Sequence, residues 1–361
     1  MSPASDMNKL AISKSHRDAK TCLFLLESRF RYFNRPVFYF AAAVIIFLAG
    51  YWYGGIKNAC NYTGGQIREG GYEYINPLLE CDIAKESIPR YFSFESETKR
   101  QIKKILDDYP NTTLALYFRN LNNGPWFGIN EEEEFIPASL LKVPVMIAYL
   151  KQAEADPSIL EQRLTAIDKK GVNYRQNIAP SSQVEIGKSY TVSELLHYAI
   201  AHSDNYATIT LIDGLTVEKI NKVYTDLNLP LPGETNETNA FEAAVSVKNY
   251  ASFFRILYNA SYLNEQMSEY ALKMLTEVDF RDGIVAEIPP DVKVAHKFGE
   301  RGLKDSVQIH DCGIVYAPNY PYLICIMTRG SNIAENEELI AETSRIIFKE
   351  VIENKDNFKR E

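Results

Sequence analysis

The sequence is poor in the residues that build specialised sites. It has five cysteines and five histidines among 361 residues, and no group of Cys and His has the spacing of a metal site. We therefore expect no metal and no cofactor. The sequence also lacks an excess of positive charge. Residues 1–36 hold seven Lys/Arg and three Asp/Glu, a net charge of +4. Since the whole chain has a net charge of −8, the remaining residues have a net charge of −12. An acidic body of this kind argues against a nucleic-acid partner.

Repeats and low-complexity tracts are also missing, while apolar residues make up 46% of the chain. This composition excludes a collagen-like chain and a largely disordered one. Once the tails are set aside, roughly 260 residues remain, enough to bury a core in one large domain or two lobes.

One run of twenty residues contains no charge. Residues 37–56, VFYFAAAVIIFLAGYWYGGI, have about the length that a membrane-spanning helix needs. Aromatic residues at both ends are typical of membrane interfaces, and the basic residues before the run predict an N-terminus inside the cell. We expect a single-pass anchor in a bacterial cytoplasmic membrane, with residues 1–36 as a cytoplasmic tail and the rest outside. A buried core helix would show a polar stripe, and a cleaved signal peptide would be shorter and start earlier.

Four cysteines would lie outside the membrane, where disulfides persist. Cys60 and Cys81 bracket a short segment after the anchor. Cys312 and Cys325 flank a turn at 317–321 and would face each other in a hairpin. For this second pair, a disulfide and two buried thiols are both open, and we favour the thiols.

The order of predicted elements places strands at both ends and helices between them. Residues 57–95, rich in Gly, Asn and Tyr, are predicted to be a stalk, and 96–355 the folded domain. Its predicted elements are a helix at 95–108, strands at 113–120 and 126–129, helices within 137–259, strands at 292–298, 307–316 and 322–328, and a helix at 334–353. This order predicts an α/β (α+β) fold, in which the two ends form a mixed lobe around an all-helical insertion.

A single lysine lies in an apolar segment. Residues 135–150, FIPASLLKVPVMIAYL, contain one charge, Lys142, and a helix this apolar is buried. Burial lowers the pKa of a lysine toward the range of a general base. Ser139 would lie one turn away on the same face, near the helix N-terminus. The pair predicts an activated serine nucleophile, although Ser96–Lys99 repeats the S-x-x-K spacing in a polar helix, where it predicts nothing.

Two further short motifs follow, Ser-Asp-Asn at 203–205 and Lys-Phe-Gly at 297–299. The first comes directly after the amphipathic run 191–200, and helix capping is its ordinary interpretation. The second places a lysine in an apolar strand, followed by a glycine that allows close backbone approach; an edge-strand lysine is its ordinary interpretation. Neither motif predicts catalysis by itself.

Taken together and in this order, the three motifs resemble the signature of the penicillin-recognising serine hydrolases. The sequence is most similar to class A β-lactamases and to D-alanyl-D-alanine peptidases, over residues 96–355. The resemblance implies a β-lactamase/transpeptidase-like fold, with an antiparallel sheet flanked by helices and an all-helical lobe.

The resemblance also implies a role for each matched residue. Ser139 would be the acylated nucleophile and Lys142 the base that activates it. Ser203 would pass a proton to the leaving nitrogen, with Lys297 polarising its hydroxyl and attracting the substrate carboxylate. The residues that it assigns to substrate binding are Asn205, Gly299 and Glu300. Asn205 would hold the acylamide side chain of the substrate. The backbone N–H groups of Ser139 and Glu300 would together form an oxyanion hole.

The sequence departs from this family's pattern in two places. Phe298 stands where a Thr or Ser hydroxyl would contact the substrate carboxylate, and Arg301 and Lys304 are candidates to replace that contact. Class A enzymes deacylate through a loop glutamate, but the corresponding stretch, 229–242, has no clear match. Its glutamates, which solvation on a loop explains equally well, are Glu234, Glu237 and Glu242.

Three functions are consistent with these residues. The first is a membrane-anchored class A β-lactamase-like hydrolase, the second a D-alanyl-D-alanine peptidase acting on peptidoglycan, and the third a non-catalytic sensor that becomes acylated. A tail of 36 residues leaves no room for a cytoplasmic signalling domain, which argues against the sensor. The expected partner is a small β-lactam or a peptidoglycan stem peptide, and we expect a monomer.

Overall fold

The structure, a computed structural model, describes residues 66–81, 88–122, 124–169, 176–229 and 244–353, together with Tyr39 and Val44. The chain divides into two units, Met1–Thr63 and Gly64–Glu361. The predicted membrane segment and Cys60 lie outside the described residues, apart from Tyr39 and Val44, which are helical and exposed. Among the helices that are described, none is long and apolar enough to cross a membrane.

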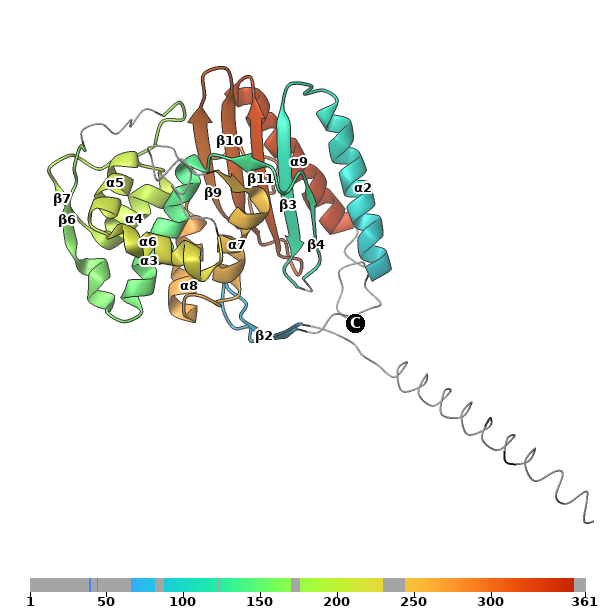
Figure 1. Cartoon of the computed structure of the whole chain (residues 1–361), viewed down its shortest axis with the longest axis horizontal. Helices are drawn as coiled ribbons and strands as arrows, with labels where there is room; N and C mark the ends of the chain where they lie inside the picture. The colour runs from blue at the N-terminus through green and yellow to red at the C-terminus, as the bar shows by residue number, and fades with distance from the viewer. Residues whose placement is uncertain are drawn as a thin grey trace, which may run out of the picture. The chain divides into compact units, whose positions relative to one another are not determined.

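A five-stranded antiparallel sheet forms one layer of the second unit, with the strand order β4-β3-β11-β10-β9 (Figure 1). Its strands are Thr113–Asn120 (β3), Trp126–Ile129 (β4), Val294–Gly302 (β9), Val307–Val315 (β10) and Tyr322–Gly330 (β11). The neighbouring interior strands β10 and β11 are buried along nearly their whole length because helices cover both faces of the sheet. The predicted antiparallel sheet is therefore confirmed, and β9 lies at its edge.

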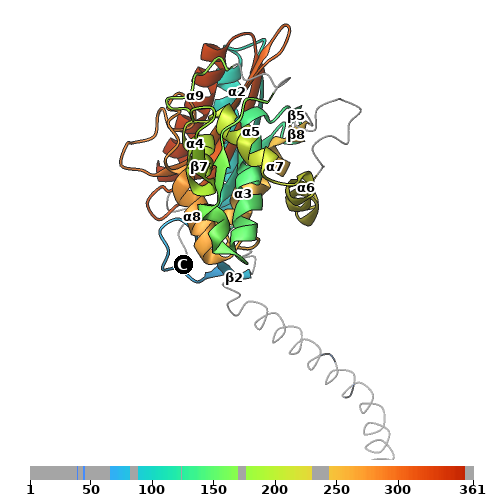
Figure 2. The same cartoon turned by 90° about the vertical axis from the view of Figure 1, so that its left-hand side faces the viewer.

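Two helices from the two ends of the unit cover one face of the sheet. They are α2 (Ile88–Leu106) and α9 (Ile333–Glu353), which lie behind the helical lobe in Figure 2. Their apolar residues form a core with the strands that includes Ile102, Phe118 and Leu339. The sequence predicted this pair of terminal helices, although α2 begins seven residues earlier than Glu95.

The helical lobe is inserted between the first and last strands of the sheet and packs against its other face (Figure 1). Its helices are α3 (Lys142–Ala153), α4 (Val192–Ala201), α5 (Asn205–Asp213), α6 (Val217–Asp226), α7 (Val247–Tyr258) and α8 (Glu265–Leu275), with 3₁₀ turns η2 (Ala138–Leu141) and η3 (Pro157–Glu161). Two short strand pairs complete it, β5 (Glu134–Phe135) with β8 (Val245–Ser246) and β6 (Arg163–Thr165) with β7 (Ser189–Thr191).

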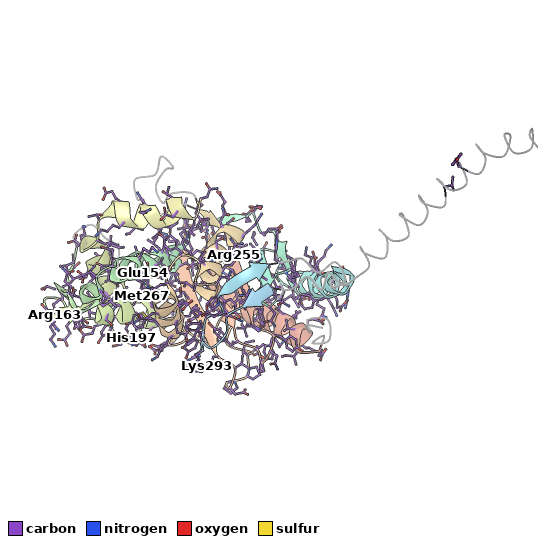
Figure 3. The ribbon with its side chains drawn as sticks, turned by 90° about the horizontal axis from the view of Figure 1, so that it is seen from below. Glu154, Arg163, His197, Arg255, Met267 and Lys293 are labelled. Atoms are coloured by element: carbon purple, nitrogen blue, oxygen red, sulfur yellow. A yellow bond between two sulfur atoms is a disulfide. The ribbon has the colours of Figure 1, made fainter. Side chains whose placement is uncertain are left out.

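Part of the segment expected to be a stalk packs against this lobe. A hairpin of β1 (Gln66–Arg68) and β2 (Leu78–Cys81) lies beside the end of α7 that carries Arg255 (Figure 3). Between the two strands, the Glu269 carboxylate accepts hydrogen bonds from three consecutive backbone N–H groups, at 73, 74 and 75. Tyr74 and Ile75 are buried in the core of the lobe. Residues 68–77 are thus held by the domain rather than extended from it.

The second cysteine pair is a disulfide. Cys312 on β10 lies opposite Cys325 on β11, with their Cα atoms 3.9 Å apart, and the structure joins the two residues. Our preference for two buried thiols was wrong, because the antiparallel register places these side chains directly across from each other.

Candidate active site

Ser139 lies in a 3₁₀ turn rather than inside a long helix. The sequence predicted one helix from 135, but Ala138 has a φ of 51°, which a continuous right-handed helix cannot contain. The backbone therefore forms the turn η2, which carries a half-buried Ser139, and α3 begins only at Lys142. Ser139 still precedes Lys142 by one helical turn, as the spacing predicted.

Lys142 is buried and makes three hydrogen bonds. The residue is only 3% exposed. Its Nζ atom donates hydrogen bonds to the Ser203 carbonyl at 2.6 Å, to Ser203 Oγ at 3.0 Å and to Asn205 Oδ1 at 2.9 Å. Burial lowers the pKa of Lys142 to about 7, against the opposing effect of the Asp204 and Glu300 charges. Near neutral pH, both the ammonium and the free amine are therefore populated.

The Ser-Asp-Asn motif serves two purposes. Asp204 is the N-cap of α5, where its carboxylate accepts the N–H groups of Tyr206 and Val184, each at 2.8 Å. The capping interpretation is therefore correct for this residue. Ser203, however, has a left-handed φ of 56°, and its side chain and that of Asn205 both meet Lys142. The cap thus fixes the turn that presents the other two side chains to the lysine.

Lys297 lies on the edge strand β9, but it is completely buried. Its Nζ donates to Ser203 Oγ at 3.0 Å and to the Phe298 carbonyl at 3.1 Å. Burial, and after it the charge of Lys142, hold the pKa of Lys297 well below its ordinary value. One hydroxyl, that of Ser203, therefore lies between the amines of two buried lysines.

Gly299 allows β9 to approach the turn that carries Ser139. A Cβ atom at this position would lie 2.9 Å from the Pro137 carbonyl oxygen and 3.2 Å from the Leu140 nitrogen. Side chains do not fit at such distances, so the glycine is required here, as the motif predicted. Strand β9 therefore packs directly against η2 at this glycine.

Phe298 is packed rather than open to a substrate. Its ring is 5% exposed and stacks on Phe280, with centroids 4.3 Å apart, and the Lys297 ammonium lies 4.1 Å from the ring centroid. The aromatic ring offers a cation–π contact to the lysine and no hydrogen-bonding group to a carboxylate. Arg301 lies further along β9, and Lys304 is exposed in the turn after it.

Some predicted site residues cannot be placed. Glu234, Glu237 and Glu242, the candidates for a deacylation base, lie outside the described residues. Within the described ranges, no group of three or more His, Cys, Asp or Glu could hold a metal ion.

Two side chains near the motifs were not predicted. Gln176, in an irregular segment, donates from Nε2 to the Ser203 carbonyl at 3.1 Å. Glu300 was expected to act through its backbone N–H, but its carboxylate also accepts the backbone N–H groups of Asn177 and Ile178. Irregular segments carry no periodic signal, so the sequence alone offers no means of finding Gln176.

The chain is similar in sequence to known β-lactamases. Residues 97–351 match the model of the "Beta-lactamase enzyme family". Beta-lactamase VEB-1 of Pseudomonas aeruginosa is 20% identical over 261 residues, which cover 66% of this chain and 85% of that protein. Extended-spectrum beta-lactamase PER-1 of the same organism is 22% identical over 241 residues, covering 61% and 76%.

Solved structures share the fold. A mutant of PBP-A in an acyl-enzyme complex with penicillin G is 23% identical, with a TM-score of 0.59, and the match covers 72% of this chain and 97% of the other. A class A beta-lactamase from Bacteroides cellulosilyticus is 20% identical, with a TM-score of 0.61, covering 72% and 98%.

Proposed function

Because the chain belongs to the β-lactamase enzyme family, a family of serine acyl-transfer hydrolases, we propose that it opens β-lactam amides through an acyl-enzyme on Ser139. The observation that carries this proposal is the Ser203 hydroxyl, held 3.0 Å from the Nζ atoms of both Lys142 and Lys297. A hydroxyl that accepts from two amines has its own proton free to donate, as a leaving nitrogen requires.

Acylation then proceeds in two stages, with three proton transfers. The free amine of Lys142 takes the proton of the Ser139 hydroxyl while Oγ attacks the amide carbonyl, and the new C–O bond forms a tetrahedral oxyanion. When the C–N bond breaks, Ser203 donates its proton to the nitrogen and regains one from the Lys142 ammonium, which returns to the free amine. The pKa of about 7 for Lys142 suits both directions of transfer.

Deacylation needs a different base, because a water must be activated beside the ester. Glu234, Glu237 and Glu242 are the candidates, in a stretch without a clear match to the loop of class A enzymes. We therefore expect slow turnover of benzylpenicillin after fast acylation. The same feature supports the second candidate function, a D-alanyl-D-alanine peptidase, as does the likeness in fold to PBP-A.

Stopped-flow hydrolysis of benzylpenicillin, with intact-mass spectra taken in parallel, tests this function. The expected result is a burst of β-lactam ring opening equal to the enzyme concentration, an adduct of the whole penicillin on the protein, and then a low steady rate. Substituting the three glutamates by Gln one at a time identifies a deacylation base, as the variant whose adduct lives longer while the burst is unchanged. Release of D-alanine from a D-Ala-D-Ala peptide favours the peptidase, and absence of any adduct and any hydrolysis refutes both functions.

We also propose that residues 37–56 anchor the enzyme in the cytoplasmic membrane with the catalytic domain outside. The uncharged run and the basic residues before it support this topology. Full-length protein should fractionate with membranes, and protease added to intact spheroplasts should digest the catalytic domain. A catalytic domain that stays protected until the spheroplasts are lysed contradicts the topology.

A further inference from the structure

We propose that the Glu300 side chain is a positioning residue of this active site, tying segment 176–178 of the helical lobe to the sheet and so holding Ser203. The inference rests on the proposed function, because its effect is measured on the acylation of Ser139. It concerns the carboxylate of Glu300, and is separate from the role expected of its backbone N–H.

The Glu300 carboxylate connects two separate parts of the domain. It extends from the edge strand β9, and its Oε1 atom accepts the backbone N–H groups of both Asn177 and Ile178, the second at 3.2 Å. Ile178 packs against both hydrophobic cores of the domain, so the segment is seated at the junction of sheet and helical lobe. A charged acceptor shared by two N–H groups is stronger than a neutral one, and fixes the course of the backbone.

The fixed segment ends on the motif that handles the leaving-group proton. Gln176, directly before the two bonded N–H groups, donates to the Ser203 carbonyl, which also accepts the shortest hydrogen bond of Lys142. Ser203 has a left-handed φ, a conformation that non-glycine residues keep only when their surroundings hold them. The hydrogen bonds from Lys142 and Gln176 to the Ser203 carbonyl provide that restraint. Glu300 orients Gln176 by holding the two residues that follow it.

The same carboxylate acts on the charge of the proposed base. Glu300 and Asp204 are the anions that oppose the lowering of the Lys142 pKa by burial. Among the described residues, Lys297 also faces Lys142, whose charge lowers the pKa of Lys297. Removing the Glu300 charge therefore lowers the Lys142 pKa further, so the free amine persists to lower pH.

The charges facing Glu300 itself provide a matched control. Glu337 on α9 has its pKa raised to about 7 by burial and by the nearby charges of Asp282 and Glu300. It is not among the charges that act on Lys142. Glu337→Gln thus removes a neighbouring carboxylate of the same kind without touching segment 176–178 or the base.

The experiment measures the rate constant of acylation by benzylpenicillin against pH, on the full-length protein. The acid limb of this profile is the pH range in which the rate falls as Lys142 becomes protonated. Glu300→Gln keeps an oxygen acceptor for the two N–H groups but loses the charge, so this limb should move to lower pH. Glu300→Ala loses both and should acylate up to about 100-fold more slowly at the plateau, as expected for a displaced catalytic group. Glu337→Gln should leave the limb and the plateau at their wild-type values.

A double variant separates positioning from independent effects. If Glu300 acts through Gln176, then Gln176→Ala should also slow acylation, and adding it to Glu300→Ala should cause little further loss. An acid limb of Glu300→Gln at the wild-type pH, a wild-type plateau in Glu300→Ala, or fully additive losses in the double variant would each overturn the inference. A wild-type protein that forms no adduct on Ser139 would instead refute the proposed function.

Discussion

The spacing Ser-x-x-Lys occurs twice in this domain, and the two copies differ in their surroundings. In Ser96–Lys99, on α2, the serine is exposed and the lysine pairs with Glu95 at 2.7 Å, with its side chain 39% exposed. In Ser139–Lys142 the lysine is 3% exposed, and its ammonium is bonded to Ser203 and to an asparagine from the same motif. The lysine of the first copy is in an ordinary surface ion pair, and that of the second is buried, one turn after a serine, with its pKa lowered to about 7.

The difference shows which part of a motif carries the chemistry. The spacing alone places two side chains one turn apart, and does so equally in both copies. Only burial lowers the pKa of the lysine toward the range that a general base needs, because desolvation disfavours its charged form. The apolar run around Lys142 was therefore a better guide to the site than the Ser-x-x-Lys spacing.

The largest expected effect is at the serines. Ser139→Ala removes the nucleophile and should abolish covalent labelling by a fluorescent penicillin. Ser96→Ala is the matched control on the polar copy and should label at the wild-type rate, because its hydroxyl lies on a solvent-exposed face. Gel fluorescence after a time course measures both. Equal loss in the two variants would mean that the domain had unfolded, which circular dichroism detects.

The lysines should give the next largest effect. Lys142→Ala should slow acylation by about 10²–10⁴-fold, the range for loss of a positioned general base. Lys99→Ala removes an exposed ion pair, which stabilises a protein by about 0–1 kcal/mol, and a contact with the Phe127 ring; this variant should acylate normally. The second-order rate constant of adduct formation, taken from intact-mass spectra, measures both. Near-normal acylation of Lys142→Ala would remove this lysine from the base role.

The wild-type rate should depend on pH through Lys142. Its pKa is about 7, and only the free amine accepts the serine proton, so acylation should fall below pH 7 by about tenfold per pH unit. Above pH 7 the rate should level off, because the amine is already free. A profile from pH 5 to 9 under single-turnover conditions checks this. A rate that keeps rising toward pH 10 would indicate an unshifted lysine as the base.

The smallest effect is expected in the third motif. Phe298→Thr introduces a hydroxyl where the family pattern has one, and a hydrogen bond to a charged group contributes about 1.5–3 kcal/mol. We expect acylation by benzylpenicillin to become about tenfold faster, and acylation by its methyl ester, which lacks the carboxylate, to be unaffected. Phe298→Leu is the control that removes the stack on Phe280 without adding a hydroxyl. An equal gain for acid and ester would show that the hydroxyl does not act on the carboxylate.

The sequence predicted the sheet better than the site. The bounds of β3 and β4 agree with the prediction because a short apolar strand, a turn and a returning strand are defined locally. The helix predicted from 135 was wrong at its start, because the left-handed φ of Ala138 interrupts it and α3 begins only at Lys142. The contact of Gln176 with Ser203 and that of the Glu300 carboxylate with Asn177 join residues far apart in the sequence. They arise only from the tertiary fold, which no local pattern encodes.

Peptide mapping of the benzylpenicillin adduct tests the central claim most directly. The tryptic peptide 120–142 contains Ser139 as its only serine, whereas the other copy of the motif lies in peptide 91–99. Digestion of the wild-type protein soon after mixing should place the whole adduct on peptide 120–142, at Ser139, and none on 91–99. An adduct on any other peptide, or an unmodified peptide 120–142 in protein whose intact mass shows one equivalent of penicillin attached, would contradict a Ser139 acyl-enzyme.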